Sequence, residues 1–349
     1  MGRVEPAAGP ARRPTLTDVA RAAQVSLKTV SRVVNEEANV SPEMAEKVRR
    51  AADSLGYRHN RMAALLRSGR SGMISLIIRD LTNSFYSAVA VGAEAVVESQ
   101  RSLLVISSHE ARLDRQQELL EVMLNHRADG IILAPAAGID PLLKAEVARG
   151  MPVVAIDVEP PGTQIDSVTF DNRRAARDAV DEAIRMGASR FAMIFESYQL
   201  ATMGLRRDGA VDALRAHGLE VRPELIRDGA QSSAEAHAIA AELMAAPDPP
   251  DAIFCGNNIA AVGAAGLTRG KNVTLISFDD FPLSTVLKAP VVIVDHDARE
   301  MGATAAEMLF QRIADPTRPV RRAICPTVIK SRKGNREFST VEVARKSTG

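Results

Sequence analysis

Lys28 and Arg32 lie four residues apart in the stretch LTDVARAAQVSLKTVSRVVN, so in a helix they share one face. Val30 and Val33 mark the opposite, apolar face of the same helix. A helix that exposes two such cations fits the major groove of B-DNA, where Arg and Lys donate hydrogen bonds to guanine. Spacing alone leaves a second interpretation open, in which the pair belongs to the solvated face of an ordinary helical hairpin.

Three short helices are expected to position this pair. Thr15, with Asp18 three residues later, has the spacing of a capping box and predicts the start of a first helix. Ser26 can cap a second helix, and Ser41, followed by proline, can open a third helix that stops near Gly56. The apolar residues expected to face inward on the third helix are Met44, Val48, Ala51, Ala52 and Leu55.

The texture of the sequence changes at Gly72, where short runs of Val, Ile and Leu begin to alternate with helical stretches. The runs are MISLII, LLVIS, GIIL, PVVAI, SVTF, FAMIF, AIFC and VTLISF. Continuous apolar runs are typical of strands buried on both faces, and their alternation with helices predicts an α/β fold with parallel strands. The body could hold one large sheet or two smaller ones, and 349 residues exceed what one core usually needs.

Polar and aromatic side chains follow these strands. Ligands of parallel sheets lie beyond the carboxyl ends of the strands, so these side chains are candidates for a binding site. The candidates at these ends are Asp80, Phe85, Tyr86, Asp157, Phe170, Tyr198, Asn257 and Asp279. Aromatic faces combined with carboxylates and amides suit a small polar ligand with a ring, such as a sugar. Each residue alone could equally fill the core or cap the next helix.

Charge is unevenly spread along the chain. Residues 1–70 carry 13 Lys and Arg against 7 Asp and Glu, a net charge of +6, so the remainder carries −5 within a total of +1. A basic head on an acidic body suggests that the head meets a polyanion, although charge alone is equally consistent with a solvated surface.

Several classes of protein are not expected. The longest apolar runs are too short to cross a bilayer, and the first residues lack the apolar core of a signal peptide. Cys255 and Cys325 are far apart in sequence, which fits reduced thiols in a cytoplasm. The six His are scattered, and neither GxSxG nor HExxH occurs, so we expect no metal, no cofactor and no catalytic activity.

The head sequence resembles that of the LacI/GalR family of transcription factors, from TLTDVARAAQVSLKTVSRVVN to VSPEMAEKVRRAADSLGYRHNRMAALLRSGRSG, and the likeness extends over nearly all of residues 14–338. It implies a helix-turn-helix head, a hinge helix, and a periplasmic-binding-protein-like body of two doubly wound, parallel-sheet subdomains joined by three crossovers. The expected divisions are a DNA-binding domain at 14–60, a hinge at 61–71, and an effector-binding and dimerisation domain at 72–338. Within the body, the N-subdomain is expected at 72–168 and 293–322, and the C-subdomain at 169–292 and 323–338. Composition predicts a disordered N-terminus at 1–13 and a flexible tail at 339–349.

The resemblance also implies which residues contact DNA. In that family the positions of Leu27, Lys28 and Arg32 read bases, and hydroxyl groups on the head can donate to phosphates. Further expected contacts are Thr15, Leu16, Ser26, Thr29, Ser31, Asn35, Tyr57 and Asn60. In the hinge, Ala63 and Leu66 match a wedge that enters the minor groove, whereas the residues alone fit equally well a linker whose leucines pack on the body. Gln24 stands where the family usually has glycine in the turn.

For the body, the resemblance assigns the effector grip to Arg206, with Asp157, Asn257 and Asp279 as further pocket positions. A guanidinium with carboxylates and an amide suits vicinal hydroxyls, although the arginine could equally hold a carboxylate. The sequence departs from the family pattern at Ser84, Asn258 and His296, and the strand FAMIF lacks the glycine that commonly ends it.

The expected function is therefore that of a cytoplasmic, nucleoid-associated, DNA-binding transcriptional regulator. The resemblance implies a repressor that acts as a homodimer on double-stranded operator DNA and responds to a sugar-like small-molecule effector, with no membrane partner. The rival interpretation is a solute-binding protein, exported or cytoplasmic, that has no role on DNA.

Overall fold

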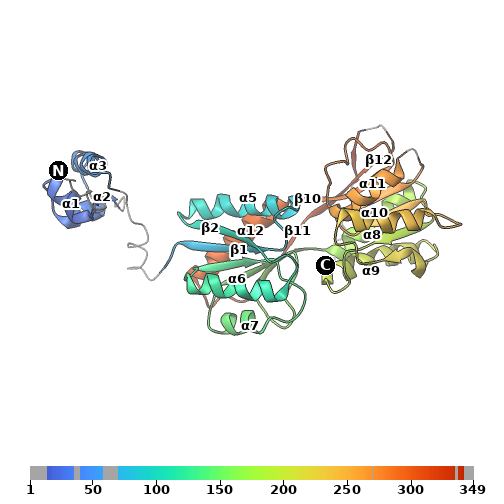
Figure 1. Ribbon diagram of the computed structural model, residues 1–349, viewed down its shortest axis with the longest axis horizontal. Helices are drawn as coiled ribbons and strands as arrows, with labels where there is room; N and C mark the ends of the chain where they lie inside the picture. Colours follow the sequence, from blue (N-terminus) through green and yellow to red (C-terminus); the bar gives the residue numbers. More distant parts are fainter. Residues whose placement is uncertain (1–13, 35–39, 58–69, 270, 335–336, 342–349) are drawn as a thin grey trace, which may run out of the picture. The chain divides into compact units, whose positions relative to one another are not determined.

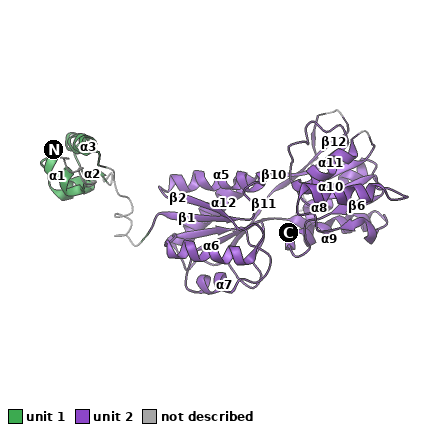
Figure 2. Cartoon of the chain, in the orientation of Figure 1, with its two compact units in different colours: residues 1–70 green, residues 71–349 purple. Residues whose placement is uncertain are grey.

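A computed structural model describes residues 14–34, 40–57, 70–269, 271–334 and 337–341 of the chain (Figure 1). The chain divides into two compact units, residues 1–70 and residues 71–349 (Figure 2). The expected disordered N-terminus and most of the expected hinge lie outside the described residues. No helix of the described part is long and apolar enough to span a bilayer.

The described residues of the first unit form a head of three helices. Its helices are α1 (Leu16–Ala22), α2 (Leu27–Val34) and α3 (Pro42–Ser54). Val19, Val30 and Val48 are fully buried between them, which confirms the expected inward face of the second helix and part of that of the third. Met44 and Leu55 were wrongly expected to face inward: they are 36% and 37% exposed, whereas Val48 and Ala51 between them are buried.

The helix starts of the head follow the predicted caps. The Thr15 side chain accepts a hydrogen bond from the Asp18 amide, and the Asp18 carboxylate accepts one from the Thr15 amide. Ser26 accepts from the Thr29 amide at 3.1 Å, and Ser41 accepts from the Met44 amide at 3.4 Å. Each cap satisfies one of the amides that a helix start leaves without an intrahelical partner.

The second unit, called the body below, contains two sheets rather than one. The first is a six-stranded, parallel sheet in the order β11-β5-β4-β3-β1-β2. Its strands are β1 (Met73–Ile78), β2 (Leu103–Ser108), β3 (Gly130–Leu133), β4 (Val153–Ile156), β5 (Asp166–Phe170) and β11 (Arg322–Cys325). The covering helices are α5 (Ser84–Ser99) and α12 (Ala298–Ala314) on one face, with α6 (Leu113–Asn125) and α7 (Pro141–Ala148) on the other. We call this half the N-subdomain.

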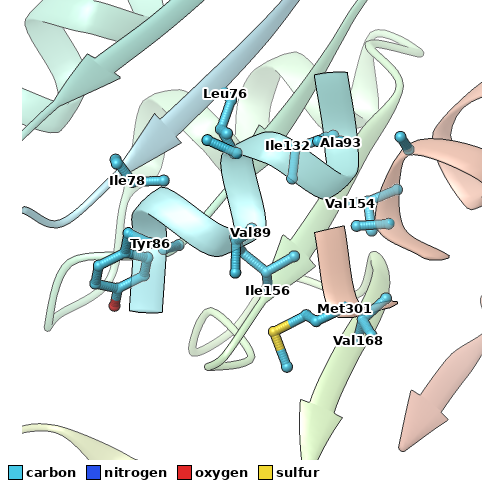
Figure 3. Close-up of a cluster of buried hydrophobic side chains, with 14 of the residues drawn as sticks. Leu76, Ile78, Tyr86, Val89, Ala93, Ile132, Val154, Ile156, Val168 and Met301 are labelled. Atoms are coloured by element: carbon cyan, nitrogen blue, oxygen red, sulfur yellow. The ribbon is translucent and has the colours of Figure 1, made fainter. Parts of the chain in front are cut away.

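The core of the N-subdomain lies between the sheet and the helices α5 and α12. Leu76 and Ile78 from β1, with Val154 and Ile156 from β4, pack there against Val89 of α5, and all five are fully buried (Figure 3). Because both faces of the strands are covered, alternate residues of each strand fill opposite layers, and this explains the continuous apolar runs of the sequence.

The second sheet has seven strands in the order β13-β12-β10-β9-β8-β6-β7; β12 pairs in antiparallel fashion with both β10 and β13, and the other pairings are parallel. Its strands are β6 (Phe191–Ile194), β7 (Ile226–Arg227), β8 (Ala252–Cys255), β9 (Thr274–Phe278), β10 (Val291–His296), β12 (Thr327–Arg332) and β13 (Ser339–Val341). The covering helices are α8 (Asn172–Arg185) and α9 (Ala201–Ala216) on one face, with α10 (Ser233–Met244) and α11 (Asn258–Thr268) on the other. We call this half the C-subdomain.

The chain crosses between the subdomains three times. The crossings lie at Asp171 between β5 and α8, at Asp297 between β10 and α12, and at Pro326 between β11 and β12. Each crossing lies a few residues later than the expected boundaries at 168, 292 and 322, because β5, β10 and β11 end only at residues 170, 296 and 325. The expected tail also begins too early, since Ser339–Val341 pairs with β12.

Helices α5 and α12 approach each other so closely that their backbones touch. A Cβ atom added to Gly92 of α5 would lie 2.0 Å from the carbonyl oxygen of Arg299, and one added to Gly302 of α12 would lie 1.9 Å from that of Val89. Real Cβ atoms do not approach a backbone oxygen this closely. The two glycines therefore set the spacing of this helix pair, which covers the N-subdomain sheet.

Candidate functional site

The second helix of the head presents the expected base-reading side chains outward. Val30 and Val33 are buried, whereas Leu27 is 51% exposed and Lys28 is exposed as well. Arg32 follows on the same face one turn later and is partly exposed. The packing of α2 on the rest of the head thus leaves the predicted reading face accessible.

Other expected DNA contacts have roles inside the head. The Thr15 hydroxyl donates to the Asp18 carboxylate at 2.7 Å, and the hydroxyls of Ser26 and Thr29 lie 2.8 Å apart. Leu16 and Tyr57 pack, partly buried, against the head core. Ser31 lies partly exposed on α2. The expected contacts outside the described residues are Asn35, Asn60, Ala63 and Leu66.

Gln24 adopts the left-handed backbone conformation that the turn before α2 requires, with φ of 51°. Left-handed backbone costs a residue with a side chain about 1 kcal/mol relative to glycine. The turn nevertheless keeps its hydrogen bonds, because the Val25 amide donates to the Ala20 carbonyl at 3.0 Å. The helix-turn-helix therefore forms despite the strained backbone at this departure from the family pattern.

A cavity of about 510 Å³ lies in the body and is lined from both subdomains. Seven of the nine expected effector residues line it: Asp80, Phe85, Tyr86, Asp157, Arg206, Asn257 and Asp279. Their common place is the carboxyl end of a strand or the first turns of the helix that follows. The parallel topology brings all of these ends to the same region of the body.

Two expected effector residues are not part of the lining. Phe170 is buried behind it, with its ring centroid 4.2 Å from that of His296. Tyr198 lies partly buried on the C-subdomain beneath the guanidinium of Arg207, 4.9 Å from the ring centroid. A place after a strand was enough to nominate both residues, but packing turns their rings away from the cavity.

Arg206 reaches the cavity from α9 and is only 3% exposed. Its Nε donates to Oδ1 of Asn172, and one terminal nitrogen donates to the Gly256 carbonyl, both at 2.7 Å. The guanidinium carbon lies 3.6 Å from the ring centroid of Phe278. This side chain is thus fixed in orientation before any ligand arrives, which lowers the entropic cost of binding.

Asp157 faces Arg206 from the other subdomain, and their nearest oxygen and nitrogen are 4.0 Å apart. The Tyr86 hydroxyl donates to Asp157 at 3.1 Å. Burial raises the pKa of Asp157, and the nearby charge of Asp279 raises it further, while Arg206 acts in the opposite direction. Asp157 is therefore a carboxyl group short of compensating partners, and it can accept hydrogen bonds from a ligand's hydroxyl groups.

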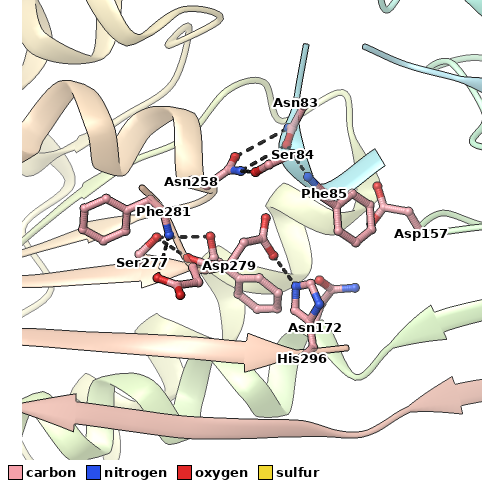
Figure 4. A network of polar contacts seen from close by, with 12 residues as sticks. Asn83, Ser84, Phe85, Asp157, Asn172, Asn258, Ser277, Asp279, Phe281 and His296 are labelled. Atoms are coloured by element: carbon pink, nitrogen blue, oxygen red, sulfur yellow. Dashed lines mark hydrogen bonds and ion pairs between the residues drawn. The ribbon is translucent and has the colours of Figure 1, made fainter. Parts of the chain in front are cut away.

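Asp279 has a protein partner that Asp157 lacks. His296 Nε2 lies 2.6 Å from Asp279 Oδ1, as Figure 4 shows. Burial alone would raise the pKa of Asp279, but the hydrogen bond and charge of His296, together with Arg206, hold that pKa below its ordinary value. The His296 ring is itself held between Phe85 and Phe170. Phe170 therefore supports the site indirectly, through His296.

Polar contacts also join the two subdomains directly across the cavity. Asn258 of α11 donates to Asn83 at 3.0 Å and to the Ser84 hydroxyl at 3.4 Å, so two departures from the family pattern contact each other (Figure 4). Arg79 and Glu196 form an ion pair, again between the N-subdomain and the C-subdomain. Burial raises the pKa of Glu196, and the charge of Arg79 opposes that rise.

Sequence reasoning named neither Arg79 nor Glu196 as a binding residue. The signal that could have found them was their position, since Arg79 directly follows β1 and Glu196 lies two residues after the end of β6. Asn172 and His296 were also missed as supports for Arg206 and Asp279. No group of His, Cys, Asp and Glu side chains among the described residues is arranged to hold a metal ion.

A helix-turn-helix head, followed by an α/β body with a polar cavity between two subdomains, defines the class of ligand-responsive DNA-binding regulators. Residues 15–60 match the family described as bacterial regulatory proteins of the lacI family. Residues 71–333 match that of the periplasmic binding proteins and sugar binding domain of the LacI family. The chain belongs to the LacI family and is a DNA-binding transcriptional regulator.

Named relatives agree with this assignment. Catabolite control protein A of Priestia megaterium is 31% identical over 302 residues, which cover 84% of this chain and 91% of that protein. The maltose regulon regulatory protein MalI of Escherichia coli K12 is 29% identical over 332 residues, covering 90% of this chain and 97% of the relative. Both relatives are named as regulators rather than as enzymes.

Solved structures share the architecture. A complex of the transcriptional regulator CelR with cellobiose is 27% identical, with a TM-score of 0.68 and coverage of 91% of this chain and 98% of the other. The lac repressor dimer bound to operator and the anti-inducer ONPF has a TM-score of 0.81 at 23% identity, covering 93% and 99% of the two chains. This second likeness shows the shared fold.

Proposed function

We propose that this regulator is a repressor whose affinity for its operator is controlled by a small, sugar-like effector bound between the two subdomains of the body. The observation that carries the proposal is the polar cavity, where Arg206 and Asp279 face Asp157 across the interface of the subdomains. A ligand that contacts both halves favours one arrangement of them over another, and a difference of about 1–3 kcal/mol in affinity is enough to switch DNA occupancy.

The cavity lining suits hydroxyl groups. Arg206 offers hydrogen-bond donors in a fixed plane, whereas Asp157 and Asp279 accept hydrogen bonds from adjacent hydroxyls, and the Asn257 amide can donate and accept. Phe85 and Tyr86 supply aromatic surface beside them. The CelR relative is described in complex with cellobiose, a neutral sugar, which agrees with this chemistry.

On the DNA side, we assign base reading to Leu27, Lys28 and Arg32 on the exposed face of α2. A homodimer joined through the bodies would present two such helices to a pseudo-palindromic site. The proposed minor-groove wedge at Ala63 and Leu66 falls outside the described residues and stays a prediction from the sequence. Because its target is the chromosome, we place the protein in the bacterial cytoplasm, associated with the nucleoid.

The test has two stages. Selection of bound fragments from randomised duplexes identifies the operator, and fluorescence anisotropy then measures affinity with and without a panel of sugars. We expect a palindromic consensus, nanomolar-range binding that weakens steeply with salt, and at least one sugar that changes the affinity about 5-fold or more. Absence of binding to any duplex at low ionic strength would instead favour a solute-binding protein with no role on DNA.

A further inference from the structure

Three arginines line the cavity among the described residues, and each is already committed to an acceptor on the protein. Arg79 pairs with Glu196. Arg206 donates to Asn172 and Gly256 and stacks on Phe278. Arg112 forks onto the Asp114 carboxylate, with contacts of 3.2 and 2.5 Å, in an exposed position. The charges of Arg79 and Arg112 are thus paired with carboxylates, whereas Arg206 has two donors occupied by neutral oxygens and its third nitrogen 4.0 Å from Asp157.

Carboxylates outnumber the arginines in the same lining. The acidic residues are Asp80, Glu110, Asp157, Glu196 and Asp279. The pKa values of Asp157 and Glu196 are both raised by burial, so these two groups already lack full compensation of their charge. A further negative charge brought into the cavity would be repelled, whereas hydroxyl groups of a neutral ligand can donate to these carboxylates.

Glu196 has the largest influence on the charge that a ligand meets, because its carboxylate compensates the positive charge of Arg79. Arg79 follows β1 of the N-subdomain and Glu196 follows β6 of the C-subdomain, so the pair forms only where the two halves meet. The side chains are 19% and 12% exposed, which shields the pair from solvent screening. Asn257 adds a hydrogen bond to Glu196 at 3.2 Å.

We propose that the Arg79–Glu196 ion pair is a charge filter that restricts the effector to polyols without an anionic group. The inference rests on the proposed effector function of the cavity and names its ligand class. Arg206 in isolation could bind either hydroxyl groups or a carboxylate. The proposed filter implies that in this cavity it donates hydrogen bonds to hydroxyl groups of the effector.

The filter is tested by removing one charge at a time in the full-length protein. Glu196→Gln keeps the shape of the side chain but leaves the positive charge of Arg79 uncompensated. Glu110→Gln is the matched control, because Glu110 also lines the cavity, and its substitution removes the same negative charge without touching the pair. The double variant Arg79→Gln with Glu196→Gln removes both charges and returns the net charge of the site to its starting value.

Melting temperatures and calorimetric titrations are measured with matched probes: glucose against glucuronate, galactose against galacturonate, and inorganic phosphate. In the wild type we expect no uronate to stabilise the protein more than its neutral parent. Glu196→Gln should bind at least one of the anionic probes roughly 10-fold or more tightly than the wild type does, since a hydrogen bond to a charged group is worth more than this factor. The double variant should lose that gain.

Three outcomes would overturn the filter: tighter binding of a uronate than of its parent by the wild type, no gain in anion binding by Glu196→Gln, or an equal gain by Glu110→Gln. These titrations contain no DNA. A failure of the filter is thus distinguishable from a failure of the proposed regulator, which the operator-binding experiment reports separately.

Discussion

Asp157 and Asp279 occupy corresponding places in the two halves of the body. Asp157 directly follows β4 of one sheet and Asp279 directly follows β9 of the other. Both have left-handed backbone conformations, with φ of 65° and 72°. Their carboxylates line the same cavity, yet the pKa of Asp157 is raised and that of Asp279 is lowered, because only Asp279 has His296 as a close partner.

The free energy of unfolding of Asp157→Asn, relative to that of the wild type, should increase as the pH rises. Because the folded-state pKa of Asp157 lies above its unfolded value, the folded protein retains this proton where the unfolded chain has lost it, and the wild type loses stability as the pH rises above about 4. Asn tolerates the left-handed backbone and does not ionise. Urea unfolding at pH 4 and pH 7 should show the stability difference between variant and wild type shifting in favour of the variant at pH 7.

For Asp279→Asn, we expect the opposite pH dependence of stability relative to the wild type. The folded-state pKa of Asp279 lies below its unfolded value, so its ionised form stabilises the fold above about pH 4 and this contribution is lost as the pH falls through the folded pKa. The variant should be less stable than the wild type at pH 7, and the gap should narrow towards pH 3. A pH-independent gap for either variant would contradict the assigned shifts.

Gly92→Ala should destabilise the body by about 1–3 kcal/mol or more, because the added methyl group would collide with the Arg299 carbonyl and force α5 away from α12. Gly266→Ala on α11 is the matched control. A Cβ there meets nothing within 4 Å, so the gain in helix propensity should stabilise the body by up to about 1 kcal/mol. Thermal unfolding should order the melting temperatures as Gly266→Ala, wild type, Gly92→Ala.

Lys28→Ala should weaken operator binding by about 1–3 kcal/mol and relax selectivity at one base pair of each half-site, if this exposed side chain reads a base. Lys47→Ala removes the same charge from an exposed position on α3 of the same head. That control should reduce affinity less, and by the same factor for all sequences. Anisotropy on a set of single-base operator variants separates the two patterns.

Arg206→Ala should abolish the response to the effector, with ligand affinity reduced roughly 100-fold or more, since two or more charge-assisted hydrogen bonds are lost together. Operator affinity without ligand should change little. Arg207→Ala is the control, because Arg207 is the next residue of α9 but contacts Tyr198 outside the cavity. Equal loss of ligand binding in both variants would argue against the assigned grip.

The sequence was sufficient to predict features that depend on local chemistry. The caps at Thr15 and Ser41 follow from short-range rules, and the place of Asp157 and Asp279 follows from the topology of parallel sheets. The direction in which a side chain points was harder to predict from the sequence. Phe170 is the last residue of β5, close to where the lining residues lie, but its ring packs behind His296, and the sequence does not distinguish the two orientations.

The pairing of Arg79 with Glu196 was beyond sequence reasoning for a different reason. The two residues are 117 positions apart and belong to different sheets, so their contact depends on how the subdomains close over the cavity. The crossing points were also placed a few residues too early, because they were taken from a family resemblance, which does not report where β5, β10 and β11 end in this chain.

The three crossings also govern the order in which this protein can be assembled on the ribosome. The first sheet begins at Met73, but its covering helix α12 and its edge strand β11 come from residues 298–325, after nearly all of the second sheet has been synthesised. Until then, the apolar side chains that α12 will cover stay open to water and to other nascent chains. The N-terminal half of the body therefore begins first but stays incomplete until residues 298–325 have emerged, shortly before β12 and β13 complete the second sheet. During this long interval it depends most on chaperones.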